Sequence, residues 1–517
     1  MPSVADLIFI AILCVLVFTP LSTRLLGDAG IGWHIRTGQE ILTTHTIPRT
    51  DPYSSTVAGK PWFAWEWLYD AVIAYLHSVC GLNGPVWFTA IFIAGTFAAL
   101  FRFLMIRGAN LFVGLVLVLL AASASTIHFL ARPHVVSWLM CLVWFWILDS
   151  AEKALPLSAS HTRLATLWFL PPLMTLWVNI HGAFLVGFVL LTIFWISTLW
   201  TWSRLRAARI EESFQKIAAG RQLKQLSLVG VITLAASFAN PYGWNLHAHI
   251  YSYLSDRFLM DHVEEFRSPN FHGVAERCFL MLLIVCVASL AIRGREIRAS
   301  GLLTALFAIY AGITASRNVP IASVLLVMSV APLLSKLPVL PDLADRMTNV
   351  EFQLKGYLWP VLAVLVALVI AVHGGRFGSD QVMAAHFDPR RMPVDAVDFL
   401  STEQIRGPFL SPDYWGGYLI YRLYPHQMVV LDDRHDLYGS EFLKSYLQTI
   451  HVENGWGVFL KQTQPRCLVL PSSSALANMI GGTQGWRSIY ADSVATVFER
   501  DLASAAPGTR KGESGDH

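Results

Sequence analysis

Four ionisable side chains in one polar stretch near the start of the chain are the first candidates for chemistry. The stretch, Gly27 to Trp67, lies between strongly apolar segments and carries Asp28, His34, Arg36 and Glu66. Glu66 stands between two tryptophans. A partly buried carboxylate in that setting needs a raised proton affinity or a nearby cation, unless it is simply solvated. Ionisable groups against apolar walls are typical of functional sites, so this stretch predicts one.

The composition indicates what kind of chain holds this stretch. Of the 517 residues, 54% are hydrophobic and only 14% are charged, and the mean hydropathy is +0.50. That is too apolar for a soluble globular protein, so the sequence predicts an integral membrane protein. The net charge of +3 is close to neutral and predicts no nucleic-acid partner. The six cysteines show neither metal-ligand spacing nor a disulfide framework.

A helix needs roughly 20 apolar residues to cross the hydrocarbon core, and about eleven segments approach that length. They lie near 5–22, 85–106, 110–126, 134–150, 164–179, 182–200, 226–239, 277–293, 299–315, 318–334 and 356–373. Lys and Arg gather in the loops at 201–225, 102–107 and 293–298, which the positive-inside rule makes cytoplasmic. The sequence therefore predicts a transmembrane domain at 1–373, with a cytoplasmic N-terminus and a first outer loop at 23–84.

Polar side chains recur where the predicted spans end on the outer side. The motifs FLARPH, WVNIHG, ANPYGW, HVEEFRSP and SRNVP supply Arg132, His134, Asn179, His181, Asn240, Glu264, Glu265 and Arg317. The cytoplasmic loops hold mostly scattered basic residues instead. This asymmetry predicts a site that opens to the outer leaflet, although each motif alone is also an ordinary helix cap or interfacial anchor.

From residue 374 the long apolar runs stop, and short apolar runs alternate with helical patterns. Helices are expected at 393–404, 415–424 and 439–450, and strands at 407–410, 428–431, 466–470, 487–490 and 494–499. This pattern predicts a small extracytoplasmic α/β domain at 374–503. A disordered tail is predicted at 504–517, where Gly, Ser and charged residues dominate.

Two motifs in that domain hold further candidates. SPDYWGGYLIYRLYP contains Tyr414 and Trp415 before a Gly–Gly pair, which favours a tight turn into a helix with its amide end open to an anion. VVLDDRHDLYGSEF contains Asp433 and Arg434 after a predicted strand. Its carboxylates predict a site for a divalent cation or for sugar hydroxyls, or else a capped turn with one internal salt bridge.

Together these motifs resemble a known family. DAGIGWHIRTGQEI, IPRTDPYSSTVAGKPWFAWEWL, LWVNIHGAFLVG, FANPYGW, YWGGYLIYRLYP and DDRHDLYG look like a bacterial branch of the GT-C superfamily of polyprenyl-phosphate-dependent glycosyltransferases. The resemblance covers nearly the whole chain and implies a polytopic α-helical membrane protein with a C-terminal outer domain. YWGGY is also similar to the Trp-Trp-Asp-Tyr-Gly signature of oligosaccharyltransferases, with Gly416 at the position of the acid.

The resemblance implies a role for each candidate residue. The early acid of the first outer loop serves as general base or metal ligand, which matches Asp28. Glu66 matches a second carboxylate, and Gly30 stands where many relatives carry another acid. Asp28 and Glu66 are thus the candidate catalytic residues and the candidate ligands of a divalent cation, Mg or Mn. The side chains expected at the lipid phosphate or substrate are His34, Arg36, Arg132, His134, Asn179, His181, Asn240, Arg317, Tyr414, Trp415, Asp433 and Arg434.

The implied reaction is an inverting transfer of a hexosyl or pentosyl group at the outer face of the bacterial cytoplasmic membrane. The donor is a polyprenyl-phosphate sugar, and the acceptor is a glycan, lipid or protein. The departing phosphate needs positive charge and the acceptor hydroxyl needs a base, so Asp28, Glu66, Arg132, His181 and Arg317 are expected to line one cavity. Two other classes remain open: a transporter or flippase, and a non-catalytic envelope protein that binds glycan.

Overall fold

The chain forms two compact units in the computed structural model, which describes residues 1–153, 164–207, 214–334, 339–354 and 356–501. The bundle unit consists of Met1–Leu26, Thr37–Ile47 and Phe63–His386. The sheet unit consists of Gly27–Arg36, Pro48–Trp62 and the chain from Phe387 onward. The predicted tail at 504–517 and residues 208–213 of the predicted basic loop lie outside the described residues.

The described part of the bundle unit is almost entirely helical. Its α-helices are α1 (Val4–Phe18), α2 (Leu21–Leu25), α4 (Trp67–Cys80), α5 (Asn83–Ile106), α6 (Leu111–Ser125), α7 (His134–Glu152), α9 (Leu170–Val178), α10 (Leu185–Ala207), α11 (Phe214–Ala236), α12 (Trp244–Ser255), α13 (Arg257–His262), α14 (Val274–Arg293), α15 (Ala299–Thr314), α16 (Val319–Leu334), α17 (Pro341–Gln353) and α18 (Leu358–Val372). Its 3-10 turns are η1 (Thr126–His128), η2 (Thr166–Phe169), η3 (Gly182–Phe184), η4 (Glu264–Phe266), η5 (Gly294–Glu296) and η6 (Ser316–Asn318). A short hairpin pairs β1 (Arg376–Phe377) with β2 (Asp380–Gln381), and α3 (Ile31–Thr44) runs from the sheet unit into the bundle unit.

Six helical segments of the described chain are long and apolar enough to cross a membrane. They are Asn83–Ile106, Leu111–His128, His134–Glu152, Gly182–Ala207, Val274–Glu296 and Ser316–Leu334, and α17 with α18, taken as one bent segment, would add a seventh. Val4–Phe18, Thr166–Val178 and Ala299–Thr314 are apolar but shorter. The predicted number of spans is therefore not confirmed. A 15-residue helix such as α1 reaches only about 22 Å, against roughly 30 Å of hydrocarbon.

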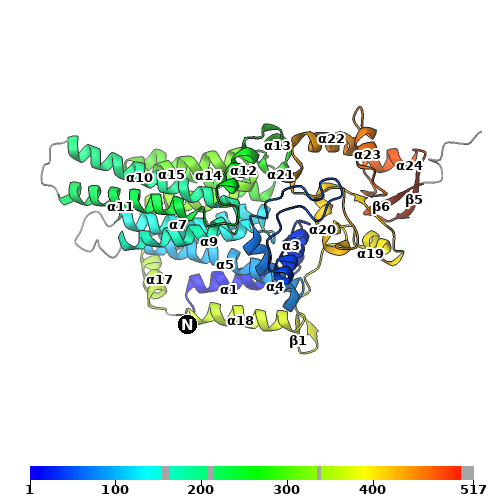
Figure 1. The fold of residues 1–517 in the computed structure, drawn as a ribbon. Helices are drawn as coiled ribbons and strands as arrows, with labels where there is room; N and C mark the ends of the chain where they lie inside the picture. Colours follow the sequence, from blue (N-terminus) through cyan, green and yellow to red (C-terminus); the bar gives the residue numbers. More distant parts are fainter. Residues whose placement is uncertain (154–163, 208–213, 335–338, 355, 502–517) are drawn as a thin grey trace, which may run out of the picture. The chain divides into compact units, whose positions relative to one another are not determined.

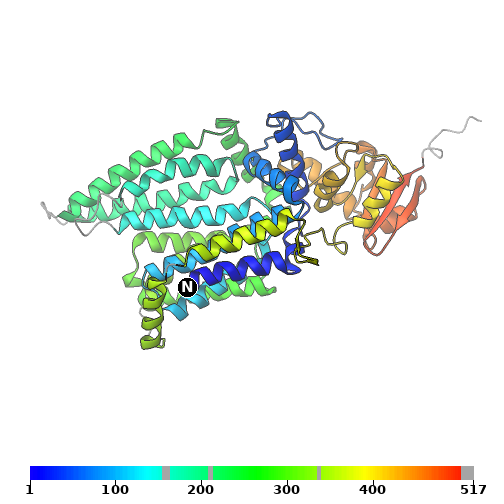
Figure 2. The same cartoon turned by 90° about the horizontal axis from the view of Figure 1, so that it is seen from below.

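The long helix α5 is central to the bundle unit. It packs against α1, α4, α6, α7 and α18, and its Phe97 and Phe101 are fully buried. Figures 1 and 2 show α1, α5, α7 and α18 running side by side, with α17 lying across their ends near the N-terminus. Glu351 of α17 fixes that end, because its carboxylate accepts the N–H of Val4 at 2.6 Å. N–H groups in the first turn of a helix lack intrahelical acceptors, so this contact stabilises the start of α1.

The sheet unit combines helices with one four-stranded sheet. Its elements are α19 (Val394–Thr402), β3 (Phe409–Leu410), α20 (Asp413–Leu423), α21 (His435–Tyr438), α22 (Ser440–Ile450), α23 (Gly457–Thr463), β4 (Cys467–Pro471), α24 (Ala475–Gly481), β5 (Trp486–Ala491) and β6 (Ala495–Arg500). The strand order is β3-β4-β6-β5, with β3 parallel to β4 and the other pairs antiparallel. The predicted strand at 428–431 is wrong, because Val429 makes only isolated bridges, to Ser54 and Phe409.

Close packing explains the Gly–Gly pair of α20. Gly416 and Gly417 lie inside this helix, so the predicted tight turn is wrong. A Cβ on Gly417 would lie 2.3 Å from the carbonyl oxygen of Ala29, and a Cβ on Gly416 would lie 2.6 Å from that of Leu431. The missing side chains let α20 pack directly against the segment that carries Asp28.

Candidate functional site

In the bundle unit, Glu66 begins a polar cluster, and its position is fixed by neighbouring motifs. It is the residue immediately before α4. The indole N–H of Trp67 donates to Asn179 Oδ1 at 2.7 Å, and the N–H of Leu68 donates to the Asn179 carbonyl at 3.3 Å. The Asn179 side chain in turn donates to the Ala239 carbonyl at 2.8 Å. Asn179 therefore ties the start of α4 to the chain that follows α11.

The ANPYGW motif holds the residues just before Glu66. The hydroxyl of Tyr242 accepts the N–H of Ala64 at 2.8 Å. Asn240 shapes the turn that presents this tyrosine, because its Oδ1 accepts the Tyr242 N–H at 2.8 Å and its Nδ2 donates to the Ser237 carbonyl at 2.9 Å. Asn240 thus supports the fold around Glu66, and its predicted contact with substrate stays a prediction.

His181 faces Glu66 from the segment between α9 and α10. Its Nε2 lies 3.9 Å from Glu66 Oε1, and the two side chains are 11% and 15% exposed. Its Nδ1 accepts the N–H of Ala183 at 3.3 Å and lies 3.0 Å from Ser137 Oγ. Burial lowers the pKa of His181 well below its usual range, and the positive charge of Arg317 lowers it further. His181 is therefore a neutral imidazole near pH 7.

A cationic cluster, which we define as Arg132, His134 and Arg317 with their partner Glu265, continues from His181. The rings of His134 and His181 have centroids 6.5 Å apart. His134 Nε2 lies 2.8 Å from the carbonyl oxygen of the preceding 3-10 turn η1, so this nitrogen carries a proton and donates. Arg132 acts electrostatically on His134, on His181 and on Glu265. The helix ends of α7, α10 and α16 thus bring their polar groups together in one unit.

Glu265 is the acidic member of the cationic cluster. Its Oε1 lies 3.3 Å from a guanidinium nitrogen of Arg317, which also lies over the Phe266 ring at 4.4 Å from its centroid. Burial would raise the pKa of Glu265, but the charges of Arg317 and Arg132 outweigh it and lower that pKa to about 2. The Glu265 side chain is 43% exposed, so water screens part of this field. Two guanidinium groups against one carboxylate favour an anionic ligand.

Asp70 lies one helical turn after Glu66 and is completely buried. Burial raises the pKa of Asp70 well above its usual range, and the negative charge of Glu66 adds to that shift. A Cβ on Gly38 would lie 1.9 Å from the Asp70 carbonyl oxygen, so the missing side chain lets α3 approach α4 closely at this point. The protonated form of Asp70 is therefore favoured beside Glu66.

In the sheet unit, Asp28 lies in a turn that leads into α3. Its Oδ1 accepts the N–H of Gly30 at 2.8 Å, and its side chain is half-buried. A carboxylate that bonds the backbone two residues ahead is typical of an Asx turn. Gly417 of α20 packs on the neighbouring Ala29. The turn and α20 together therefore set the position of Asp28.

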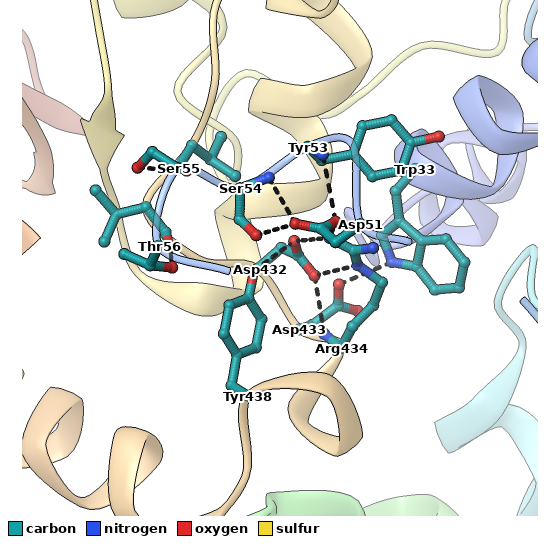
Figure 3. Close-up of polar contacts among 12 residues, drawn as sticks. Trp33, Asp51, Tyr53, Ser54, Ser55, Thr56, Asp432, Asp433, Arg434 and Tyr438 are labelled. Carbon is teal, nitrogen blue, oxygen red and sulfur yellow. Dashed lines mark hydrogen bonds and ion pairs between the residues drawn. The ribbon is translucent and has the colours of Figure 1, made fainter. Parts of the chain in front are cut away.

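A buried ion network joins two distant segments within the sheet unit, as Figure 3 shows. Arg434 donates to Asp432 through Nε at 2.8 Å and Nη2 at 2.7 Å, and to Asp51 through Nη2 at 2.8 Å. The Tyr438 hydroxyl donates to Asp432 at 2.9 Å. Burial would raise the pKa of Asp432, but the charge of Arg434 prevails and lowers it. The sequence left open whether the DDRHDLYG motif contains an internal salt bridge, and the structure shows one between Arg434 and Asp432.

Aromatic rings enclose the same guanidinium group. Arg434 lies 4.6 Å from the ring centroid of Trp62, 5.0 Å from that of Tyr53 and 5.9 Å from that of Trp33. Asp433 contacts one of these rings, because its Oδ1 accepts the Trp33 indole N–H at 2.9 Å. A cation held over several rings and two carboxylates is a rigid structural joint. The predicted substrate contacts of Asp433 and Arg434 stay predictions.

The other predicted residues of the sheet unit are placed as follows. Arg36 donates through Nε to the carbonyl of Tyr421 at 2.9 Å, at the end of α20. His34 is fully buried on α3. Trp415 is also buried, and its indole N–H donates to a backbone carbonyl at 2.9 Å. Tyr414, by contrast, is 57% exposed, so its ring is accessible to a ligand.

The predicted site residues thus form two groups. Glu66, Arg132, His134, Asn179, His181, Asn240 and Arg317 lie in the bundle unit, and Asp28, His34, Arg36, Tyr414, Trp415, Asp433 and Arg434 lie in the sheet unit. A cavity shared by Asp28 and Glu66 stays a prediction. Within the described ranges, no three His, Cys, Asp or Glu side chains converge as a metal site requires. No residue set in those ranges fits the predicted Mg or Mn.

Some residues with clear roles in these groups had no role in the sequence analysis. Ser137 and Trp177 contact each other and His181, but a Ser and a Trp in apolar helices are typical core residues. Asp51 meets Arg434 across 383 residues, and no local pattern predicts such a partner. The spacing of the charged loop motif did point to Glu265, without indicating its partner.

The fold of the chain is matched among solved structures. No protein-family model and no curated protein matches the sequence. Among solved structures, the archaeal oligosaccharyltransferase AglB from Archaeoglobus fulgidus, in complex with an inhibitory peptide and a dolichol-phosphate, matches with a TM-score of 0.56 at 12% identity, over 97% of this chain and 74% of AglB. The apo form of the Archaeoglobus fulgidus oligosaccharyltransferase matches with a TM-score of 0.50 at 12% identity, over 90% of this chain and 69% of that chain.

The chain has a GT-C fold. ArnT from Cupriavidus metallidurans bound to undecaprenyl phosphate, also a GT-C protein, is similar at 14% identity over 98% of both chains, with a TM-score of 0.46. The AglB match confirms the resemblance predicted from the sequence for the fold. At these identities the likeness concerns the GT-C architecture alone, and the chemistry has to be argued from this chain's own residues.

Proposed function

We propose that the protein is a membrane glycosyltransferase that transfers a sugar from a polyprenyl-phosphate donor to an acceptor hydroxyl. The observation that carries this proposal is the cationic cluster at the helix ends of a GT-C bundle. Arg132 and Arg317 there face one carboxylate, Glu265, and the excess positive charge matches a lipid-linked phosphate. The AglB structure of the same fold holds a dolichol-phosphate, which supports a ligand of this class.

The chemistry asked of these side chains is modest. A sugar on a polyprenyl phosphate already has a good leaving group, so positive charge on the departing phosphate and a base for the acceptor hydroxyl suffice. In our proposal Arg132 and Arg317 stabilise the phosphate, and Asp28 takes the hydroxyl proton while Glu66 orients the acceptor. The transfer proceeds with inversion, because the hydroxyl attacks the sugar carbon opposite the leaving phosphate. Hexosyl and pentosyl groups both fit this scheme.

The proposed location follows from the charge distribution of the loops. The segments at 201–225 and 293–298 carry the excess of Lys and Arg, which supports a cytoplasmic location for them. The N-terminus is then cytoplasmic, and Glu66, the cationic cluster and the sheet unit are on the outer side of a bacterial cytoplasmic membrane. The acceptor there is a glycan, a lipid or a protein.

The test uses the full-length protein in lipid nanodiscs with a panel of labelled polyprenyl-phosphate sugars. Transfer of label to an acceptor or to water supports the proposal, and loss of transfer in Asp28→Asn assigns the base. Replacing Arg132 and Arg317 by Gln should weaken donor binding by about 100-fold, at roughly 1.5 kcal/mol for each hydrogen bond to a charged group. Arg257→Gln is the matched control, because that guanidinium is 94% exposed.

Two results would replace the proposal by another class. Movement of the labelled lipid across proteoliposomes without transfer would indicate a flippase. Saturable binding of a glycan without turnover or lipid binding would indicate a non-catalytic envelope protein. Activity that depends on added Mg or Mn, and that disappears with a chelator, would restore the predicted cation.

A further inference from the structure

A chain of hydrogen bonds from the interior of the bundle determines which nitrogen of His181 carries its proton. The indole N–H of Trp177 is a donor only, and it donates to Ser137 Oγ at 2.8 Å. The single hydroxyl proton of Ser137 is then directed to His181 Nδ1 at 3.0 Å. The N–H of Ala183 also donates to Nδ1, at 3.3 Å. Two donors converge on Nδ1, so Nδ1 is the acceptor and the proton of the neutral ring is on Nε2.

The Nε2–H group is on the side of the ring that faces Glu66. Its nitrogen lies 3.9 Å from Glu66 Oε1, which is too long for a direct hydrogen bond. An oxygen about 2.8 Å from both atoms would complete the geometry, as a bridging water often does. Such an oxygen has to accept from Nε2–H and donate to a carboxylate. A hydroxyl group does both. A phosphate oxygen accepts only, and its charge has the same sign as that of Glu66.

We propose that Glu66 and His181 form a binding site for a hydroxyl group of the sugar acceptor, and that Ser137 and Trp177 are positioning residues that fix His181 for it. This proposal rests on the proposed function, since the hydroxyl is that of the acceptor. It differs from the phosphate role that the sequence suggests for His181, and it assigns the phosphate to the cationic cluster next to it. An alcohol or a polyol is thus the chemical class that this part of the site takes.

The groups around His181 keep its imidazole neutral opposite Glu66. The charged and titratable groups around His181 are Glu66 before α4, Arg317 in η6, Arg132 before α7, His134 at the start of α7, and Glu265 in η4. Burial, together with the positive charges of Arg317 and Arg132, keeps the imidazole neutral. Asn179, two residues before His181, also holds the start of α4. One short segment therefore positions both sides of the hydroxyl site.

The first test reads the tautomer directly and needs no substrate. The full-length protein with ¹⁵N-labelled histidine is placed in nanodiscs, and the His181 signals are identified by their loss in His181→Gln. We expect an unprotonated Nδ1 and a protonated Nε2 that do not change between about pH 6 and about pH 8. Ser137→Ala should give a mixture of tautomers, whereas Ser123→Ala, on α6, should not. A ring protonated on Nδ1, or on both nitrogens, would overturn the proposal.

The second test separates hydroxyl from phosphate. Undecaprenyl phosphate is the probe, and its Kd is measured for each variant. We expect His181→Ala and Ser137→Ala to keep the wild-type Kd within about twofold, and Arg317→Gln to raise it about tenfold or more. In transfer assays His181→Gln, which retains an N–H donor near the Nε2 position, should keep more activity than His181→Ala, and the loss should be in KM for the acceptor.

The outcomes distinguish this proposal from the one it rests on. A Kd that rises about tenfold in His181→Ala would assign His181 to the phosphate and overturn the hydroxyl site, while the glycosyltransferase proposal would stand. A wild-type protein that does not bind undecaprenyl phosphate or any polyprenyl-phosphate sugar would overturn the proposed function instead. The tautomer measurement stays decisive for the geometry in both cases.

Discussion

Replacing Arg434 by Met tests how much the buried ion network stabilises the sheet unit. Met retains most of the apolar stem but removes the charge that Asp51 and Asp432 share. Both carboxylates are almost completely buried, at 2% and 0% exposure. Breaking a buried ion network by removing one partner typically costs about 3–5 kcal/mol, because the remaining charge is uncompensated. The lost cation–π contacts with Trp62 and Tyr53 add roughly 1 kcal/mol.

The sheet unit should therefore lose a large share of its stability, given that domains are typically stable by only about 5–15 kcal/mol. Two assays are made on the full-length protein: its thermal unfolding, and its limited proteolysis with cleavage detected in segment 48–62. We expect Arg434→Met to unfold at lower temperature and to expose that segment to cleavage. The matched control is Arg422→Met, which breaks an ion pair with Asp398 whose side chains are 32% and 53% exposed, worth about 1 kcal/mol at most.

Charge, rather than packing, is the proposed cause. Adding Asp51→Asn and Asp432→Asn to Arg434→Met removes the unpaired charges and should recover part of the loss. The pH dependence has a definite sign. Arg434 lowers the pKa of Asp432 in the folded state, so this stabilisation is complete above the unfolded pKa of about 4 and is lost as pH falls toward the folded pKa. Equal effects of Arg434→Met and Arg422→Met would refute the reasoning.

Three further predictions concern single positions. Gly417→Ala places a Cβ 2.3 Å from the Ala29 carbonyl oxygen, so it should destabilise the sheet unit by about 1–3 kcal/mol and lower transfer through Asp28. Unfolding and activity assays measure the two effects. The control Gly481→Ala, whose Cβ has its nearest neighbour at 4.0 Å, should show neither effect in the same assays. Asp70→Asn should gain stability over the wild type as pH rises above about 4, because folded wild-type protein keeps a proton on Asp70 that the unfolded chain releases. The difference in the free energy of unfolding should grow by about 1.4 kcal/mol per pH unit, which unfolding measured at several pH values will show. Glu265→Gln removes the carboxylate that competes with the ligand for Arg317, so it should lower the Kd of undecaprenyl phosphate about fivefold at low salt. A higher Kd in a binding titration would contradict this.

Local patterns in the sequence were sufficient for the helices and for many of the polar helix ends. Each segment predicted to span falls on a helix, since apolar runs and helical periodicity are local properties. The number of spans was not obtained in this way, because the apolar runs of α1 and α15 give helices shorter than a bilayer requires. The clustering of Glu66, His181 and Arg317 follows from three helix ends that the motifs had singled out.

Features that depend on distant partners were missed for a physical reason. Gly416 and Gly417 look like a turn, but their small size serves contact with Leu431 and Ala29, which no local window includes. Val429 has the pattern of a strand yet makes only isolated bridges. Asp51 is one of many loop aspartates until the fold brings Arg434 to it. Tertiary packing, rather than propensity, decides these positions.

The central claim is that the cationic cluster binds the phosphate of a polyprenyl carrier. The most direct measurement compares the Kd of undecaprenyl phosphate with that of undecaprenol, for the wild type and for the variant with Arg132 and Arg317 both replaced by Gln. We predict that the wild type binds the phosphate at least about tenfold more tightly than the alcohol, and that this preference disappears in the variant. Equal Kd values for the two lipids in the wild type, or a preference that survives in the variant, would contradict the account.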